Sequence, residues 1–256
     1  MTSPAIALTD IVKRYGAHAA LDRVSLSIPA GQFVALVGAS GSGKTSLLKT
    51  INRLVAPTSG GISIAGQDAT GLPTHILRRR IGYVFQEVGL FPHMTLAENI
   101  AITPRLLGWT PDRISARVAN LLGLVDLPAE MATRLPGELS GGQRQRIGVA
   151  RALAAEPKIL LMDEPFGALD PVTRDSLGGD VRALHDQLSL TTVMVTHDMA
   201  EAVLLADRIV IMRGGQIVAD GTAAALARHA DPQVASLMDG PRRQAERLRA
   251  KFGAEA

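Results

Sequence analysis

Short, unbroken apolar runs are the clearest feature of the hydrophobic pattern along this chain. They recur at residues 33–37, 159–162, 193–195 and 209–212, and amphipathic, helix-like stretches separate several of them. Strands of this kind are buried on both faces, which is typical of a parallel sheet covered by helices. We therefore expect an α/β fold with a parallel sheet at its core.

The N-terminal part follows a different pattern. Residues 5–13 and 24–28 alternate apolar and polar positions, as strands with one solvated face do. Residues 61–66 resemble a further short strand, and the Pro-Ala-Gly segment at 29–31 marks a turn. This part predicts an antiparallel β subdomain beside the parallel core.

A long helical pattern interrupts the core after the apolar strand at residues 81–85. From Leu96 to about Ala155 the apolar spacing is that of helices, and several prolines punctuate it. We expect a helical subdomain at residues 89–156, inserted between two strands of the sheet.

The core pattern then resumes and ends in helices. We expect a helix at 175–187, although Gly178-Gly179 inside it is unusual, and a further strand at 217–219. Residues 222–256 are expected to form a C-terminal helical extension, and residues 1–256 a single domain. The last helix should begin at Pro241 and carry apolar residues on one face: Ala245, Leu248 and Phe252.

The glycine-rich segment at residues 38–45, Gly-Ala-Ser-Gly-Ser-Gly-Lys-Thr, stands between a buried strand and a helix. Glycines let the backbone curl so that successive N–H groups point at a phosphate chain, and the helix adds its positive N-terminal end. The lysine can reach the terminal phosphates, and the threonine hydroxyl can bind Mg²⁺. The segment therefore predicts a phosphate-binding P-loop.

This P-loop indicates a site for a nucleoside triphosphate with Mg²⁺ in a P-loop NTPase core of the RecA-like type. The helix that follows should bury one face made of Leu47, Leu48, Ile51 and Leu54. The predicted nucleotide-binding residues are Gly38, Ser40, Gly41, Gly43, Lys44, Thr45 and Ser46.

Composition argues against several other classes. The chain is 46% hydrophobic, which is enough for a sizeable core, and it lacks cysteine, so disulfides and thiolate metal sites are excluded. A net charge of +3 with 3% aromatic residues argues against a nucleic-acid surface. No signal peptide pattern opens the sequence, and no apolar run approaches the roughly 20 residues of a membrane span. We expect a soluble, intracellular protein.

The acidic pair Asp163-Glu164 directly follows the apolar run at 159–162. Alone, the pair would be interpreted as an acidic strand-to-loop turn. Beside a P-loop, an acid at this strand end is expected to coordinate Mg²⁺, and its neighbour can polarise the water that attacks the γ-phosphate. We predict Asp163 as a metal ligand and Glu164 as the general base.

A serine and two glycines precede the helix expected at residues 144–154, in the stretch Leu-Ser-Gly-Gly-Gln at 139–143. Ser140 suits an N-cap, but two glycines are not needed for capping and leave the helix end open to a phosphate. The stretch resembles the signature motif of ATP-binding cassette (ABC) ATPases, and the P-loop and the acidic pair flank it in the family's order. The resemblance runs from about Ala5 to Gly221.

This resemblance implies roles for four further residues. Gln86 matches the Q-loop glutamine, which meets Mg²⁺ and senses the membrane partner, and Asp170 matches the D-loop aspartate at the dimer interface. His197 matches the switch histidine that contacts the γ-phosphate, and Tyr15 matches the aromatic residue that stacks on adenine. Without the family, a strand-end glutamine would be interpreted as solvated, a strand-end histidine as structural, and the tyrosine as packed on the core.

The resemblance also implies partners. Two copies should close head to tail around two ATP molecules, so that one copy's Ser140, Gly141, Gly142, Gln143 and Asp170 complete the other's site. The homodimer should sit peripherally on the cytoplasmic face of the plasma (inner) membrane, bound to integral membrane permease subunits and indirectly to a solute-binding protein. No nucleic-acid partner is expected.

Residues 81–86, 89–95 and 98–101 resemble importer ATPases, and residues 102–109 with 163–171 are similar to glycine betaine, choline and osmoprotectant importers. Several of those carry regulatory CBS domains after the cassette, and we expect no salt sensing through such domains here. The alternative is a soluble ABC ATPase without a transport role, but neither a second cassette nor a coiled-coil insertion is seen. A P-loop kinase outside the family would leave the Leu-Ser-Gly-Gly-Gln stretch unexplained.

Overall fold

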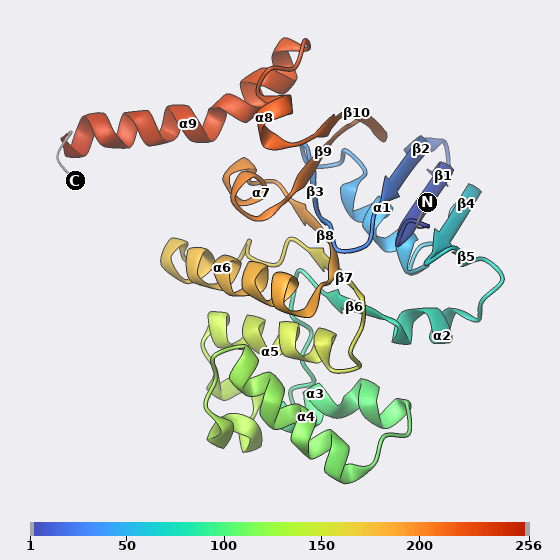
Figure 1. Ribbon diagram of the computed structural model, residues 1–256, viewed down its shortest axis with the longest axis vertical. Coiled ribbons are helices and arrows are strands. Elements are labelled where there is room, and N and C mark those ends of the chain that lie inside the picture. Colours follow the sequence, from blue (N-terminus) through green and yellow to red (C-terminus); the bar gives the residue numbers. More distant parts are fainter. Residues whose placement is uncertain (1–2, 254–256) are drawn as a thin grey trace.

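The computed structural model describes residues 3–253, apart from the side chains of Leu248 and Phe252, and contains two sheets (Figure 1). The six-stranded sheet has the order β10-β9-β3-β8-β7-β6, and the four-stranded sheet has the order β2-β1-β4-β5. The strands are β1 (Ile6–Tyr15), β2 (His18–Ile28), β3 (Phe33–Val37), β4 (Ser59–Ile64), β5 (Gln67–Asp68), β6 (Ile81–Val84), β7 (Ile159–Asp163), β8 (Thr191–Thr196), β9 (Arg208–Arg213) and β10 (Gln216–Gly221).

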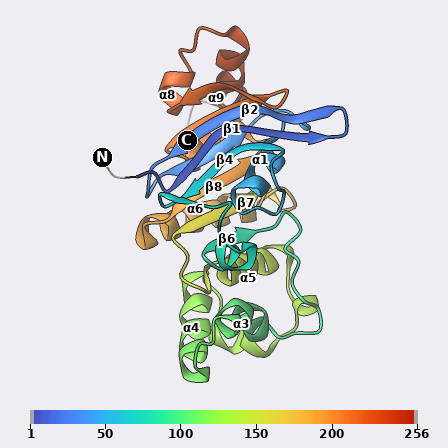
Figure 2. The same cartoon turned by 90° about the vertical axis from the view of Figure 1, so that its right-hand side faces the viewer.

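Helices pack on both faces of the six-stranded sheet, with α1 on the face that also carries the four-stranded sheet, and further helices extend below it (Figures 1 and 2). They are α1 (Lys44–Ile51), α2 (Thr74–Arg79), α3 (Leu96–Leu106), α4 (Pro111–Leu124), α5 (Gly141–Leu153), α6 (Pro171–Leu188), α7 (Met199–Leu205), α8 (Ala223–Leu226) and α9 (Pro232–Phe252), with the 3₁₀ turns η1 (Ala129–Thr133) and η2 (Pro136–Glu138).

The six-stranded sheet is the predicted parallel core. Strand β3 pairs in parallel with β8 and β9, β8 with β7, and β7 with β6, while β10 alone is antiparallel. Strand β3 is therefore central, and the loop that follows it emerges in the middle of the sheet's C-terminal edge. Ligands of open α/β sheets bind at that edge.

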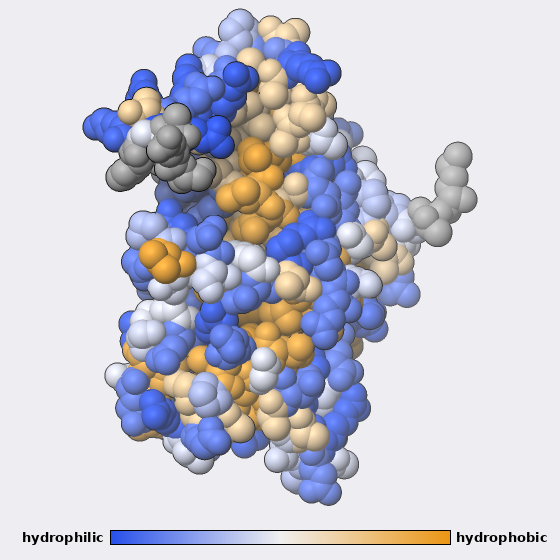
Figure 3. Space-filling view, turned by 60° about the vertical axis from the view of Figure 1, so that its left-hand side comes forward, coloured by the Kyte–Doolittle hydropathy of each residue, from blue (hydrophilic) through white to orange (hydrophobic). Residues whose placement is uncertain are grey.

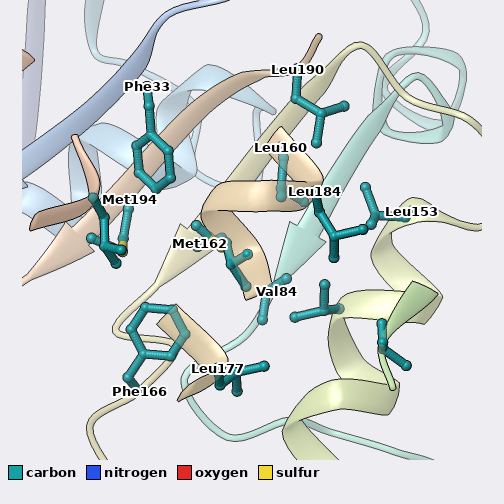
Figure 4. Packing of buried hydrophobic residues seen from close by; sticks show 14 of the residues in the cluster. Phe33, Val84, Leu153, Leu160, Met162, Phe166, Leu177, Leu184, Leu190 and Met194 are labelled. Atoms are coloured by element: carbon teal, nitrogen blue, oxygen red, sulfur yellow. The ribbon is translucent and has the colours of Figure 1, made fainter. Parts of the chain in front are cut away.

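The apolar run of β3 is divided between two cores, one on each face of the sheet. Phe33, Ala35 and Val37 belong to the core under the helices, whereas Val34 and Leu36 belong to the core shared with α1 and the four-stranded sheet. Figure 4 shows the first core, where Phe33 lies near Met194 of the neighbouring strand. Because successive strand residues point to opposite faces, a strand buried on both sides must be apolar throughout.

The antiparallel β subdomain forms as predicted, with somewhat different limits. Strand β1 pairs antiparallel with β2 and with β4, and β4 begins at Ser59 rather than at residue 61. One face of this sheet is buried: Ile6, Leu8 and Ile11 of β1 are at most 3% exposed. The sheet therefore contributes directly to the second core.

Two predicted helix limits are wrong. Helix α1 ends at Ile51, and Leu54 lies beyond it, 40% exposed, so it is not part of the buried face. Pro241 lies inside α9, which begins at Pro232, where Asp231 caps it by accepting from the Gln233 amide. An aspartate cap followed by proline is a stronger start signal than a proline alone.

The glycine pair of α6 has a partial explanation. Gly178 is buried, and a Cβ there would lie 3.5 Å from a methyl group of Leu205, so α6 and α7 approach each other closely. Nothing in the structure explains Gly179. The sequence also predicted an apolar face in the last helix. Ala245 of that face is exposed, and the side chains of Leu248 and Phe252 are not among those that the structure describes.

Among residues 3–253, no helix combines the length and the apolar character needed to cross a bilayer. Figure 3 shows one side of the molecule, where patches of apolar surface alternate with polar side chains. The more exposed apolar residues include Val172, 80% exposed at the start of α6, and Leu204, 71% exposed in α7.

Candidate nucleotide-binding site

The P-loop, residues 38–43, connects the end of β3 to the start of α1 and is folded tightly. A Cβ at Gly38 would lie 2.2 Å from the carbonyl oxygen of Met212, and one at Gly43 would lie 2.5 Å from a carbonyl oxygen of β2. Gly43 also has a φ of 102°, which favours glycine. No side chain caps α1, so its first N–H groups remain available for an anion.

Lys44, the first residue of α1, is buried beneath the loop. Its Nζ donates to the carbonyl oxygens of Gly38 at 2.7 Å and Ala39 at 2.9 Å. Burial lowers the pKa of Lys44, and the charges of Glu164 and Asp163 oppose that shift. The ammonium group therefore lies between the loop and the acidic pair, where the sequence predicted contact with phosphates.

Asp163 is held by three residues. The Thr45 hydroxyl donates to Oδ1 at 2.9 Å, the Tyr83 hydroxyl donates to Oδ2 at 3.3 Å, and Lys49 Nζ lies 3.5 Å from Oδ2. Burial and the charge of Asp163 raise the pKa of Tyr83, so the phenol remains a donor. The carboxylate is fixed at the end of β7, beside the P-loop.

Sequence analysis missed both Lys49 and Tyr83. Lys49 could have been found, because residues four apart on a helix share a face, and Lys49 is four residues after Thr45. Tyr83 has no local signal: it reaches the site because β6 pairs with β7 in parallel.

The oxygen atoms of Thr45 and Asp163 fit Mg²⁺, which takes one or two carboxylates together with substrate phosphates and water. Both are hard donors, and they lie 2.9 Å apart. No group of three or more His, Cys, Asp or Glu side chains within the described residues could hold a metal by itself. Magnesium held by Thr45 and Asp163 would take its remaining ligands from the nucleotide phosphates and water.

Glu164 and His197 come from the ends of two neighbouring parallel strands and meet. His197 Nδ1 lies 3.2 Å from Glu164 Oε2, with the two side chains 63% and 23% exposed. Glu164 has a φ of 44°, and its amide donates to the Val195 carbonyl. A non-glycine residue at positive φ is strained, and the hydrogen bond to Val195 holds Glu164 in this conformation.

Tyr15 ends β1 and is exposed. The residue is 51% exposed, and Lys13 Nζ lies 4.9 Å from the ring centre. The alternative in which this side chain packs on the core is therefore wrong. Stacking on adenine stays a prediction.

Ser140 caps α5 with a complete capping box. Its Oγ accepts from the Gln143 amide at 3.2 Å, and Gln143 Oε1 accepts from the Ser140 amide at 3.0 Å. A Cβ at Gly142 would lie 2.5 Å from the Thr173 methyl group, whereas the nearest atom to one at Gly141 is 3.9 Å away. Only Gly141 leaves the helix end open to a phosphate. Gly142 is covered by α6, and its lack of a side chain allows α5 and α6 to pack closely. The prediction that both glycines leave the helix end open is therefore wrong for Gly142.

Asp170 caps α6 and is exposed. Its carboxylate accepts from the Thr173 amide at 3.0 Å, and hydrogen bonds from Thr173 lower the pKa of Asp170. Asp170 therefore lies close to the N-terminus of α5, since Thr173 is the residue that Gly142 contacts.

The structure does not bring all predicted residues into one site. Gln86 is exposed, and in the described part of the chain no hydrogen bond joins it to Thr45 or Asp163. Likewise, no hydrogen bond or ion pair among residues 3–253 links the Ser140–Gln143 segment to the P-loop. Two surfaces result: a P-loop surface with Lys44, Asp163, Glu164 and His197, and a signature surface with Ser140, Gly141 and Asp170.

The order of P-loop, capped glycine helix and acidic strand end is that of one family. The profile described as ABC transporter matches residues 21–167. The chain belongs to the ABC transporter family. This ABC cassette is 52% identical over 85% of its length to the choline transport ATP-binding protein OpuBA of Bacillus subtilis, of which it spans 57%.

Two further relatives extend the comparison. The glycine betaine uptake system ATP-binding protein YehX of Escherichia coli is 49% identical over 84% of the cassette, which spans 70% of that protein. Among solved structures, the dimeric ABC transporter cassette MJ0796 matches with a TM-score of 0.77 and 33% identity, over 85% of this chain and 98% of that one. The ABC cassette fold is thereby established.

Proposed function

We propose that this cassette is the ATP-hydrolysing subunit of an importer for glycine betaine, choline or related osmoprotectants. The observation that carries the ATPase activity is the meeting of Glu164 with His197 beside the P-loop and Asp163. The transport role rests on relatives named as choline and glycine betaine transport proteins, which are about half identical over most of the chain.

In this proposal the P-loop surface binds Mg-ATP. Lys44 exchanges its loop carbonyls for the terminal phosphates, and the free N–H groups of α1 surround the phosphate chain. Thr45 and Asp163 would hold Mg²⁺, with Gln86 as the further predicted ligand. The bound metal would neutralise developing charge on the phosphates. Tyr15, exposed at the end of β1, would stack on adenine.

Glu164 would then act as general base toward the attacking water. The proton of that water moves to the Glu164 carboxylate, which His197 holds in position through Nδ1. General-base catalysis contributes about 10²–10⁴-fold in rate. His197 has Nδ1 engaged by Glu164, so Nε2 is the ring nitrogen left for the γ-phosphate, to which it would donate when the imidazole is protonated on both nitrogens.

Two copies would form the complete sites. The signature surface contains an open helix start at Gly141 and an exposed Asp170 but lies apart from its own P-loop. Large apolar residues flank it in sequence: Leu135 is 42% exposed and Val172 is 80% exposed. Exposed apolar groups at this position suit a protein interface, and a symmetric homodimer would place this surface on the partner's P-loop.

The permease would dock in a groove beside the loop that follows β6. The groove has a volume of about 490 Å³ and is lined by Phe85, Glu87, Phe91 and Arg151, among others. Phe85 and Phe91 are 43% and 45% exposed. An apolar groove with a charged rim suits an amphipathic helix of a membrane subunit, and a solute-binding protein would act through that permease. The subunit would thus work peripherally, on the cytoplasmic face of the plasma membrane.

Uptake of labelled glycine betaine or choline tests the proposal. We expect cells without other uptake systems to gain ATP-dependent uptake when the chain is expressed with its cognate permease and binding protein. Glu164→Gln should abolish that uptake without reducing expression. A chain that is ATPase-active but never co-purifies with a membrane protein would instead support the soluble ATPase.

Charge reversal at Glu87 tests the docking surface. We expect Glu87→Lys to reduce uptake while ATP hydrolysis by the isolated subunit is retained, because Glu87 lines the groove and is not bonded to the P-loop surface. Glu246→Lys, at an exposed residue of α9, is the matched control. Loss of basal hydrolysis in Glu87→Lys would assign the residue to the catalytic site instead.

A further inference from the structure

Arg151, in the last turn of α5, is a partly buried arginine bonded to backbone oxygens. Its Nη1 donates to the Gly89 carbonyl at 2.7 Å and its Nη2 to the Val88 carbonyl at 2.5 Å. In the part of the chain that the structure describes, no carboxylate forms an ion pair with it, and burial lowers the pKa of Arg151. Burying a guanidinium group costs free energy, and here the hydrogen bonds that two loop carbonyls accept from it offset part of that cost.

Two glycines bring the same helix against the chain on either side of Gln86. A Cβ at Gly148 would lie 2.6 Å from a methyl group of Val88, which follows Gln86. A Cβ at Gly82 of β6, which precedes Gln86, would lie 2.6 Å from the carbonyl oxygen of Ala152. The segment that carries Gln86 is therefore attached to α5 at both ends.

The opposite end of α5 carries the signature surface. Helix α5 runs from Gly141 to Leu153, about 20 Å at 1.5 Å per residue, and its N-terminus is fixed by the Ser140 capping box. A helix of this length moves as a rigid body over such a distance. Displacement of Ser140 would therefore be transmitted to Val88 and Gly89, beside the groove that Arg151 also lines.

We propose that Arg151 is a positioning residue that couples the signature surface to the loop at residues 86–89. Its planar fork holds two successive carbonyls through two separate nitrogens in a fixed geometry, which the single nitrogen of a lysine cannot reproduce. When the signature surface moves onto a partner's nucleotide, α5 carries the loop with it. This inference rests on the proposed nucleotide-driven dimer and names the residue that transmits its closure.

The absence of cysteine permits a clean test with one spin label. Glu87→Cys, labelled with a nitroxide in a Glu164→Gln background, reports the mobility of the loop before and after addition of Mg-ATP. Dimer closure is followed in the same samples by size-exclusion chromatography. With Arg151 intact, we expect the spectrum of the nitroxide at position 87 to change when the dimer closes.

Arg151→Gln should abolish the ATP-induced spectral change and leave closure in place. Arg151→Lys should retain part of the change, because an ammonium group can still donate to the loop carbonyls but lacks the fixed geometry of the fork. Gly148→Ala disturbs the same contact without changing Arg151. Its added methyl group would displace Val88 from α5, so the ATP-induced spectral change should again be lost.

Arg117→Gln is the matched control. Arg117 is also partly buried, has its pKa lowered by burial, and donates to the carbonyls of Leu153 and Ala154 at the same end of α5. It holds α4 to α5 and does not touch the loop, so the ATP-induced change should persist in this variant.

An unchanged spectral response in Arg151→Gln would overturn the proposal, and so would an equal loss in Arg117→Gln, since that would indicate general destabilisation. A parent protein that closes without any change at position 87 would overturn it as well. Failure of the parent to dimerise with ATP is a distinct result and would contradict the proposed function itself.

Discussion

Helices α1 and α5 both begin with glycine-rich turns that the sequence assigned to phosphate, yet their first turns differ. Helix α1 has no side-chain cap, and the ammonium group of Lys44 lies buried beneath its loop. Helix α5 has a complete capping box between Ser140 and Gln143, and Ser140 is exposed. The start of α1 keeps its first N–H donors free, whereas the capping box at the start of α5 satisfies the amides of Ser140 and Gln143.

This difference indicates two separate tasks. The start of α1 has a buried cation, free N–H groups and nearby acids, which is what binding and hydrolysis of a triphosphate require. Among the described residues, no acid or lysine forms a hydrogen bond or ion pair with Ser140 at the start of α5, and Arg144 donates to the Leu139 carbonyl of its own loop. The difference fits the proposed function, in which the α1 side performs the chemistry and the α5 side completes a partner's site.

Among the tests of this comparison, Glu164→Gln should give the largest effect, a loss of ATP turnover on the α1 side. Loss of the general base should lower turnover by about 10²–10⁴-fold, or roughly 3–5 kcal/mol of barrier, because the amide cannot accept the proton of the attacking water. ATP affinity should be retained and the ATP-bound dimer should live longer, whereas Lys44→Ala should weaken nucleotide binding itself. Steady-state hydrolysis and equilibrium nucleotide binding distinguish the two, and near-normal turnover in the Gln variant would rule out Glu164 as base.

Mixed dimers test whether the two helix starts meet across an interface. Lys44→Ala and Ser140→Arg should each fail to close as homodimers, since every site then carries a lesion. In the mixture, one site joins an intact P-loop from the Ser140→Arg chain to an intact signature from the Lys44→Ala chain. ATP-dependent crosslinking of differently tagged chains should rise on mixing, and closure no greater than in either parent would contradict the composite site.

Capping residues allow a smaller, matched comparison. Thr95 of α3 has the same kind of capping box as Ser140, with Glu98 in place of Gln143. Ser140→Ala and Thr95→Ala should each lower the free energy of unfolding by about 1 kcal/mol, measured by urea denaturation. Only Ser140→Ala should weaken ATP-driven dimerisation, and an equal effect of Thr95→Ala on dimerisation would reduce Ser140 to a structural cap.

Tyr83→Phe should have the smallest effect. It removes one hydrogen bond to Asp163 Oδ2, a loss of about 1 kcal/mol, and should raise the Mg²⁺ concentration needed for ATP binding by up to about fivefold. The chain has one other tyrosine, Tyr15, whose change to Phe keeps the ring and should leave that concentration unaltered. Fluorescent-ATP titrations at graded Mg²⁺ measure both, and equal shifts would show that Tyr83 does not act through Asp163.

Much of the fold could be predicted because its signals are local. The β3 run is apolar throughout since both of its faces are buried, and the glycine-rich turn, the Asp163-Glu164 pair and the Ser140 cap each occupy a few adjacent residues. Errors arose where two local signals compete. Pro241 suggested a helix start, but the aspartate and proline at 231–232 begin α9 nine residues earlier.

What the sequence by itself determined, then, is the residue types and their order: strand, P-loop, helix, signature, acidic pair, and the family that this order identifies. Only the tertiary structure decided which side chains meet. Tyr83 reaches Asp163 through strand pairing, Gly142 and Gly148 are small because Thr173 and Val88 lie against them, and Arg151 finds its carbonyls more than sixty residues away. These contacts join segments that are distant in the chain. The periodicity of one segment predicts its own secondary structure but not which residues of another segment will contact it.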